Sequence, residues 1–298
     1  MNLLLTKEIK RNKIMKLYKI ILLSIVVFLN GCNLTNQSKK NDNFASIKSC
    51  YDTYGIDNIN AIKNNVYIII DQTFILDEHL KEHVIEKISP LLVNGNKINI
   101  IKFSTFSEGH YTSVVSKDTI ETKLTNMQRD DIANNKLKKF DRCMEYKLQA
   151  KKKEIPISLM DTLNESNETI SHSEIFKTLL EVSNLHSFKK PKGNKIIILV
   201  SDMLENSSIS SFYTNNSVKM IQYKKEMKVV KKAEYLPDFK DASVYVIGAG
   251  LLSMKARNQS SSNIKKLNNL KIFWKHYFKE SNADLYGFGM PELLGDVE

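Results

Sequence analysis

The chain has 298 residues, of which 42% are apolar and 26% are charged, a globular composition with length enough for one large domain or two small ones. The formal net charge is +11, but residues 1–31 hold six Lys or Arg and one Glu, so the rest of the chain carries +6. A modest excess of scattered lysines is typical of a solvated surface. We therefore expect no nucleic-acid partner.

The N-terminus has the pattern of an export signal. Basic side chains precede the apolar run 20–29, which is too short to span a bilayer as a helix and fits the central region of a signal peptide. Leu29-Asn30-Gly31-Cys32 follows and resembles the lipobox of bacterial lipoproteins, although Asn30 departs from the small or β-branched residue usual there. The resemblance implies a signal peptide over residues 1–31, starting at Met1 or Met15, and a lipid anchor on Cys32.

The residues after Cys32 extend this interpretation. Asn33 is not Asp, and by resemblance to the sorting rule of Gram-negative lipoproteins it favours the outer membrane, with the protein facing the periplasm. Residues 33–43 are polar and aperiodic, which predicts a flexible tether. We assign residues 32–60 to this tether and an N-terminal extension, and residues 61–298 to the folded domain.

Two further cysteines, Cys50 and Cys143, leave two interpretations open. An even pair in an oxidising compartment is consistent with a disulfide between them. The other interpretation is two separately buried thiols.

The first half of the folded domain alternates apolar runs with helical periodicity. Residues 65–72 predict a strand that is buried on both faces. Apolar residues recur at helical spacing from Leu76 to Leu91, with Asp77 as the N-cap. A second strand is expected at 97–104, a shorter one at 111–116 at the sheet edge, an amphipathic Lys-rich helix within 118–154, and a polar loop over 157–170.

The second half repeats this alternation. Ser171 and Glu174 match a capping box that would open the next helix. Residues 195–202 predict a second fully buried strand, and the excursion 203–241 is long enough to indicate a functional loop or a small subdomain. A strand at 244–250, a helix at 262–280 and a strand at 283–288 follow. Gly248-Ala249-Gly250 lacks the third glycine of a dinucleotide loop, so we expect no organic cofactor.

This order of elements predicts an α/β fold with three layers, in which helices flank a doubly wound, mostly parallel central sheet. It also resembles a von Willebrand factor A (vWA) domain across roughly residues 62–290. The resemblance is carried by three strand ends, Ile69-Ile70-Asp71-Gln72-Thr73, Lys102-Phe103-Ser104 and Val200-Ser201-Asp202, and by the serines at 171–173.

The vWA resemblance implies a metal site at the carboxyl ends of the strands. The family uses an Asp-x-Ser-x-Ser loop, which here begins with Asp71 and has Thr73 in place of the first Ser. Ile75 replaces the second Ser and cannot coordinate an ion.

The remaining ligands implied by the family lie later in the chain. Its Thr position falls on Ser173, with Ser171 or Thr169 as alternatives, and its last Asp falls on Asp202. Oxygen ligands of this kind suit Mg²⁺ or Mn²⁺. In the alternative interpretation, Asp71 and Asp202 only cap helices or accept hydrogen bonds from loop amides.

These observations favour a non-enzymatic, membrane-anchored vWA-like lipoprotein that binds another envelope protein. Binding would use the face of Asp71, Ser173 and Asp202 or the 203–241 segment, with divalent-metal dependence if the degenerate site holds an ion. The alternatives are a metal-assisted hydrolase that uses the same carboxylates, and a structural component of an envelope or secretion apparatus. No set of nucleophile, base and orienting residue is visible, so we assign no catalytic residue.

Overall fold

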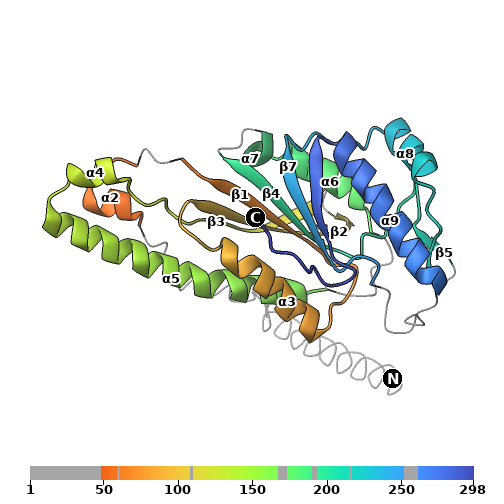
Figure 1. The fold of residues 1–298 in the computed structure, drawn as a ribbon, viewed down its shortest axis with the longest axis horizontal. Helices are drawn as coiled ribbons and strands as arrows, with labels where there is room; N and C mark the ends of the chain where they lie inside the picture. The colour runs from red at the N-terminus through yellow and green to blue at the C-terminus, as the bar shows by residue number, and fades with distance from the viewer. Residues whose placement is uncertain are drawn as a thin grey trace, which may run out of the picture. The chain divides into compact units, whose positions relative to one another are not determined.

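A computed structural model describes residues 48–58, 61–107, 110–166, 173–189, 193–214, 217–251 and 261–298 (Figure 1). The chain divides into two units, residues 1–47 and 48–298, and all the described residues belong to the second. The predicted signal peptide, Cys32 and tether therefore lie outside the described residues, as do Thr169 and Ser171. No helix in the described ranges is long and apolar enough to cross a membrane.

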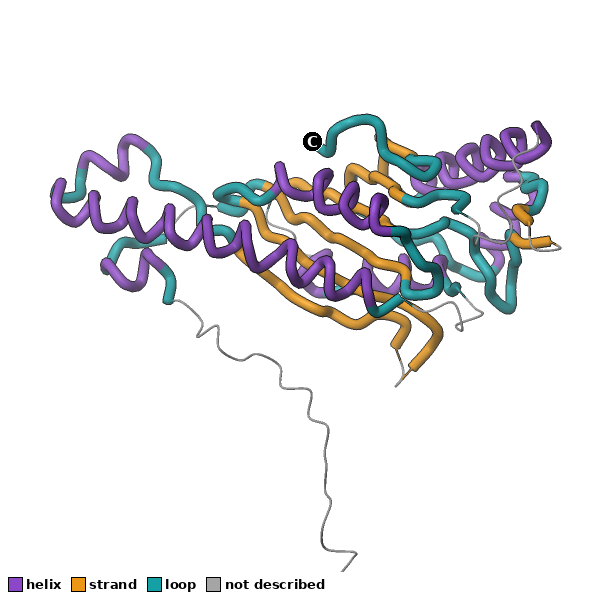
Figure 2. The backbone as a smooth tube through the Cα atoms, turned by 90° about the horizontal axis from the view of Figure 1, so that it is seen from below, coloured by secondary structure: helices purple, strands orange, loops and turns teal. Residues whose placement is uncertain are grey.

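A mixed sheet forms the centre of the domain (Figures 1 and 2). Its strand order is β3-β2-β1-β4-β7-β8, with all neighbours parallel except β3, which is antiparallel to β2 at one edge. The strands are β1 (Asn64–Asp71), β2 (Asn96–Ser107), β3 (His110–Thr119), β4 (Asn194–Val200), β7 (Ala242–Ile247) and β8 (Ala283–Phe288). The doubly wound α/β prediction is confirmed, because the order runs outward in both directions from the central pair β1 and β4.

Alternate residues of the central strands feed two separate cores. On β1, Val66, Ile68 and Ile70 join the cluster under α3 (Glu78–Ile88) and the second half of α5 (Asn134–Asn164). Tyr67 and Ile69 point the other way, into the cluster under α6 (Ile175–Asn184) and α9 (Ser261–Glu280). Because both faces of β1 are covered by helices, the strand has no polar alternation, as its sequence indicated.

The helix α5 extends further than the sequence predicted. The expected polar loop at 157–170 is wrong at its start, since α5 continues through Pro156 to Asn164. Ile155, Leu159 and Leu163 are buried at helical spacing and hold this last part of the helix against the sheet. The polar run 164–169, which follows these residues in the sequence, gave the whole segment the composition of a loop.

The two predicted helix starts had different outcomes. Asp77 caps α3 as expected, because its side chain accepts a hydrogen bond from the Leu80 amide at 3.0 Å. The capping box at Ser171 and Glu174 is wrong: α6 begins at Ile175, and its N-cap residue Glu174 makes no side-chain capping bond. A side chain from another part of the chain accepts a hydrogen bond from the first turn of this helix, as described below.

A small third cluster lies at the start of the described chain. Tyr51 of α2 (Cys50–Tyr54) packs edge-on against Phe140 of α5. The short helix α4 (Asn126–Asp130) directly precedes α5 in the chain. The structure joins Cys50 and Cys143 by a disulfide across this cluster. Residues from Lys48 onward therefore belong to the compact unit.

The described parts of the 203–241 segment contain regular structure. They form a short antiparallel ribbon, β5 (Tyr213–Thr214) with β6 (Ser217–Val218), followed by α8 (Tyr223–Lys232). We call residues 203–241 the insertion. The short helix α7 (His186–Lys189) precedes β4.

Candidate functional site

The two carboxylates predicted at the strand ends lie together in the fold. Asp71 is the last residue of β1, and Asp202 follows the neighbouring parallel strand β4. Their exposed fractions are only 1% and 3%. Parallel strands end at the same edge of a sheet, so the sequence could place this pair without knowledge of the loops.

Hydrogen bonds use every acceptor position of Asp71. Its Oδ1 accepts from the Thr73 amide at 2.9 Å and from the Thr73 hydroxyl at 2.6 Å. Its Oδ2 accepts from the hydroxyls of Ser173 at 3.1 Å and Ser201 at 2.9 Å. A carboxylate offers about four lone-pair positions, and here protein donors fill all of them.

Asp202 is held by the insertion itself. Its Oδ1 accepts from the Leu204 amide at 2.9 Å, and its Oδ2 accepts from the Tyr213 hydroxyl at 2.5 Å. Tyr213 lies on β5, so this bond fastens the ribbon to the end of β4. The interpretation in which these Asp side chains accept from loop amides therefore describes both carboxylates.

Burial makes both carboxylates weaker acids. Loss of solvent raises the pKa of Asp71 above its ordinary value, against the lowering effect of the hydrogen bonds from Thr73, Ser201 and Ser173. Burial, and then the nearby charge of Asp71, raise the pKa of Asp202 to about 7. Below about pH 7 Asp202 therefore holds a proton, and the pair does not carry two full negative charges.

A third buried acid, Glu205, bonds to the first turn of α6. Its Oε2 accepts from the Phe176 amide at 3.1 Å, which satisfies one of the free N–H groups in the first turn of that helix. Burial raises the pKa of Glu205 to about 8. This contact between distant segments replaces the local capping box that the sequence suggested.

The glycines after β7 shape the same edge of the sheet. Gly248 has φ +97°, and a Cβ there would lie 3.3 Å from the Phe74 ring and 3.3 Å from the Ser201 carbonyl oxygen. The Gly250 amide donates to the Asp202 carbonyl at 2.8 Å. The Gly-Ala-Gly sequence thus allows the chain to pass closely over the backbone of Ser201 and Asp202.

The arrangement does not fit a bound Mg²⁺ or Mn²⁺. Such an ion needs about six oxygens in near-octahedral geometry and usually keeps several waters. Protein donors use all acceptor positions of Asp71, and the Tyr213 hydroxyl bonds to Oδ2 of Asp202. Ile75, at the position of the second Ser, has no oxygen to offer, and its side chain is 48% exposed. Nor do the described residues hold a group of three or more His, Cys, Asp or Glu that could bind a metal.

The structure brings all four residues implied as ligands to the same edge of the sheet, where they form hydrogen bonds within the protein. Asp71 bonds directly to Thr73 and Ser173, while Asp202 bonds to Tyr213. Sequence reasoning missed Ser201, although it adjoins Asp202. It also missed Tyr213, for which no local pattern signals a contact back to the end of β4.

Comparisons with known proteins return only distant similarity. No protein-family model and no curated protein matches the chain. Among solved structures, the chain is similar to the vWF domain of the type V pili tip protein Mfa5 from Porphyromonas gingivalis, at 14% identity and TM-score 0.27 over 49% of this chain and 40% of that one.

Two further structures cover more of this chain. The pilus adhesin SpaC from Lactobacillus rhamnosus GG has 11% identity and TM-score 0.38, over 77% of this chain and 28% of SpaC. An aerotolerance-related membrane protein from Bacteroides fragilis NCTC 9343 has 12% identity and TM-score 0.36, over 76% of this chain and 92% of that one. The chain thus spans less than a third of SpaC, and only 20% of a three-domain structure of Mfa5.

Proposed function

We propose that this chain is a non-enzymatic binding module of the bacterial cell envelope, anchored by a lipid on Cys32 and engaging another envelope protein through the insertion. Binding is independent of a divalent ion. The buried carboxylates contribute by fixing the shape of the insertion.

The observation that carries this proposal is the way the insertion is fastened. The Met203 carbonyl accepts from the Trp274 indole N–H at 2.9 Å, the Asn206 amide donates to the Ser173 carbonyl at 2.9 Å, and Tyr213 bonds to Asp202. Long connections between elements usually carry function, and a binding surface gains affinity when its shape is fixed before the partner arrives. An insertion held at three points, by α9, by the segment before α6 and by the residue that follows β4, has that property.

Photo-crosslinking in cells that produce the protein tests this function. A photoreactive amino acid replaces Met220, which is 41% exposed in the insertion, and in separate variants replaces Tyr146 of α5 or Leu294 near the C-terminus. We expect a discrete protein adduct from position 220 and none from the other two. Adducts only from 146 or 294 would refute the role of the insertion, and no adduct at all would refute protein binding.

Metabolic labelling tests the anchor separately. Radiolabelled or alkyne-tagged palmitate should label the wild-type chain and should not label Cys32→Ala. Fractionation of labelled cells on a density gradient then shows whether the protein lies in the outer membrane. An unlabelled wild-type chain would contradict the lipoprotein assignment while leaving the binding proposal to its own test.

A further inference from the structure

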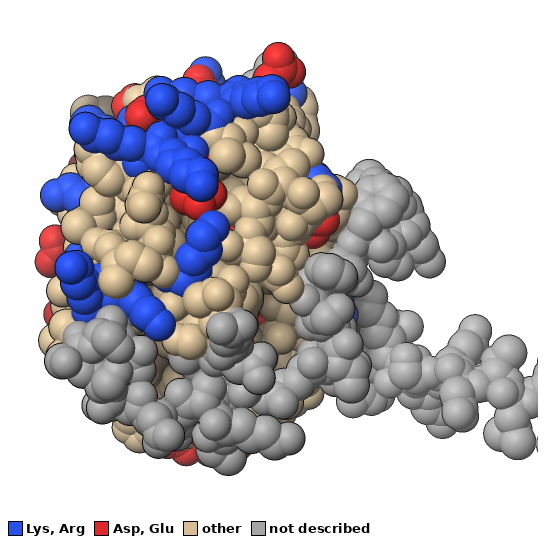
Figure 3. Space-filling model, turned by 90° about the vertical axis from the view of Figure 1, so that its right-hand side faces the viewer, with Lys and Arg blue, Asp and Glu red and all other residues tan. Residues whose placement is uncertain are grey.

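The helix α8 of the insertion presents a row of lysines to solvent. Its exposed basic side chains are Lys224, Lys225, Lys228, Lys231 and Lys232, which we call the lysine face. Basic side chains gather over α8 in the upper part of Figure 3. In the described residues, Lys231 pairs with Glu280, and no ion pair is formed by the other four.

The acidic residue of α8 does not neutralise this face. Glu226 is buried, and its carboxylate accepts from the Ser210 hydroxyl at 2.8 Å and pairs with Lys219 at 3.1 Å. It therefore secures α8 to the ribbon from the inner side of the helix, together with the buried Met227 and Val230. The outer side keeps its positive charge.

The spacing of the lysines is unfavourable for the helix alone. Lys224, Lys228 and Lys232 follow one another at intervals of four residues, so each adjacent pair places like charges on neighbouring turns and destabilises the helix. A sequence that departs from local preference in this way often does so at a functional site. Acidic groups of a partner would remove this repulsion.

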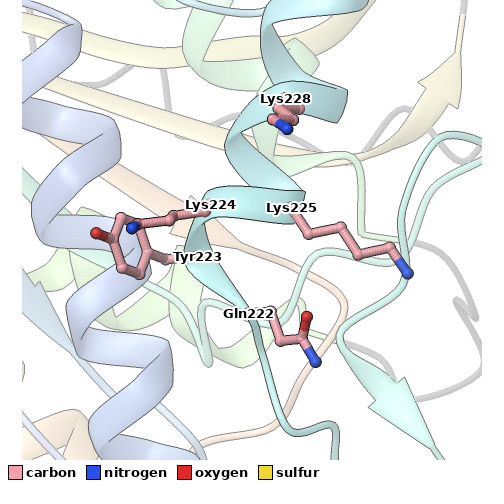
Figure 4. Close-up of a pocket in the computed structure, with 5 residues that line it drawn as sticks. All are labelled: Gln222, Tyr223, Lys224, Lys225 and Lys228. Carbon is pink, nitrogen blue, oxygen red and sulfur yellow. The ribbon is translucent and has the colours of Figure 1, made fainter.

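A hollow beside the lysines indicates the kind of partner. About 420 Å³ of open space is lined by Gln222, Tyr223, Lys224, Lys225 and Lys228, with the side chains arranged as in Figure 4. The Tyr223 ring stacks on His276 of α9 at 4.2 Å, which gives the hollow a rigid wall. A carboxylate side chain is small enough to enter this hollow, and the three lysines that line it would complement its charge.

We propose that the lysine face is the contact surface for an acidic segment of the partner protein, one of whose carboxylate side chains enters the hollow beside Tyr223. Lysines four residues apart lie about 6 Å apart along a helix. Asp or Glu at every fourth position of a partner helix, or at alternate positions of a partner strand, would match that interval. This inference rests on the proposed function and names the chemistry of the partner.

The test compares charge reversal on two helices. A photoreactive amino acid at Gln222 is combined with K224E/K228E/K232E in the full-length chain, or with the control K138E/K139E/K153E on α5, whose lysines are also exposed. We expect the adduct yield to fall about tenfold or more in the first variant and to stay within about twofold in the control, because removing complementary charge slows association. Mass spectrometry of the wild-type adduct should map the crosslink to a segment rich in Asp or Glu.

Additional variants and a vesicle-binding measurement distinguish the possible outcomes. If the reversed variant does not fold, as shown by circular dichroism, K224Q/K228Q/K232Q replaces it with the same expected direction. An adduct that persists in either variant, or that maps to a neutral segment, overturns the inference while partner binding stands. Binding of the purified full-length protein to vesicles of equal parts phosphatidylethanolamine and phosphatidylglycerol, lost on charge reversal without loss of a protein adduct, overturns it in favour of a lipid surface. No adduct from either position 220 or 222 would refute the proposed function as well.

Discussion

Replacing Tyr213 by Phe removes the hydrogen bond that joins the ribbon to Asp202 at the end of β4 and leaves the ring in place. The lost bond is 2.5 Å long and its acceptor, Asp202, is 3% exposed. A hydrogen bond to a charged group contributes about 1.5–3 kcal/mol, and leaving its buried acceptor unsatisfied costs a similar amount. We therefore expect Tyr213→Phe to lower the free energy of unfolding by about 2 kcal/mol, or Tm by about 4–8 °C in a domain of this size.

The loss should also depend on pH. The Tyr213 hydroxyl lowers the pKa of Asp202, which is about 7, so its removal raises that pKa further. The folded variant then holds the Asp202 proton more tightly, and its stability relative to wild type falls as pH rises from about 6 to about 8.5.

Urea unfolding followed by circular dichroism at the two pH values measures both effects. The control is Tyr286→Phe, since Tyr286 is 68% exposed, and it should change stability by less than about 0.5 kcal/mol. A loss for Tyr213→Phe that equals the control, or that shrinks as pH rises, would refute the reasoning about this contact.

Three further predictions concern the same domain. Mg²⁺, Mn²⁺ and EDTA should leave Tm of the wild-type protein unchanged, and a rise of several degrees with either ion in differential scanning fluorimetry would restore the metal site. Cys143→Ser should lower the free energy of unfolding by about 2–5 kcal/mol under oxidising conditions, because the disulfide to Cys50 closes a separation of 93 residues, and should have no effect in reductant. Glu205, with a pKa near 8 against 4.5 ordinarily, keeps its proton in the folded state between those values, so stability should fall as pH rises through that window by up to about 1.4 kcal/mol per pH unit. In Glu205→Gln the slope should flatten, and an unchanged slope in urea titrations would show that other groups cause it.

The central strands could be predicted because almost every residue in them is apolar and buried. The run Val66 to Ile70 has no polar position, since helices cover both faces of β1, and its length excluded a long helix. The end of α5 could not be read in the same way. Two buried leucines, Leu159 and Leu163, stand among polar residues after Pro156, and such a segment resembles a loop until the neighbouring helix and sheet are known.

The residues of the candidate site were also predictable only in part. Asp71 and Asp202 were predictable from the ends of adjacent parallel strands, and Thr73 from its position in the first loop. Tyr213 reaches Asp202 across a turn of chain whose path depends on the packing of Trp274 and Met203. A contact fixed by tertiary packing leaves no periodic signal in the local sequence.

In the function that we propose, the contact between Tyr213 and Asp202 takes the place of an ion, and the partner binds at another surface. Two carboxylates at neighbouring strand ends repel each other unless a cation or protons neutralise them. Here burial raises both pKa values, and hydroxyl donors bond to the carboxylate oxygens that would otherwise bind an ion. Without an ion, this edge offers no cation to a partner's acidic side chain. The bond from Tyr213 to Asp202 helps to hold the insertion, whose helix α8 carries the exposed lysines. In our proposal an acidic partner is recognised by lysines on a fixed helix and not through a metal ion.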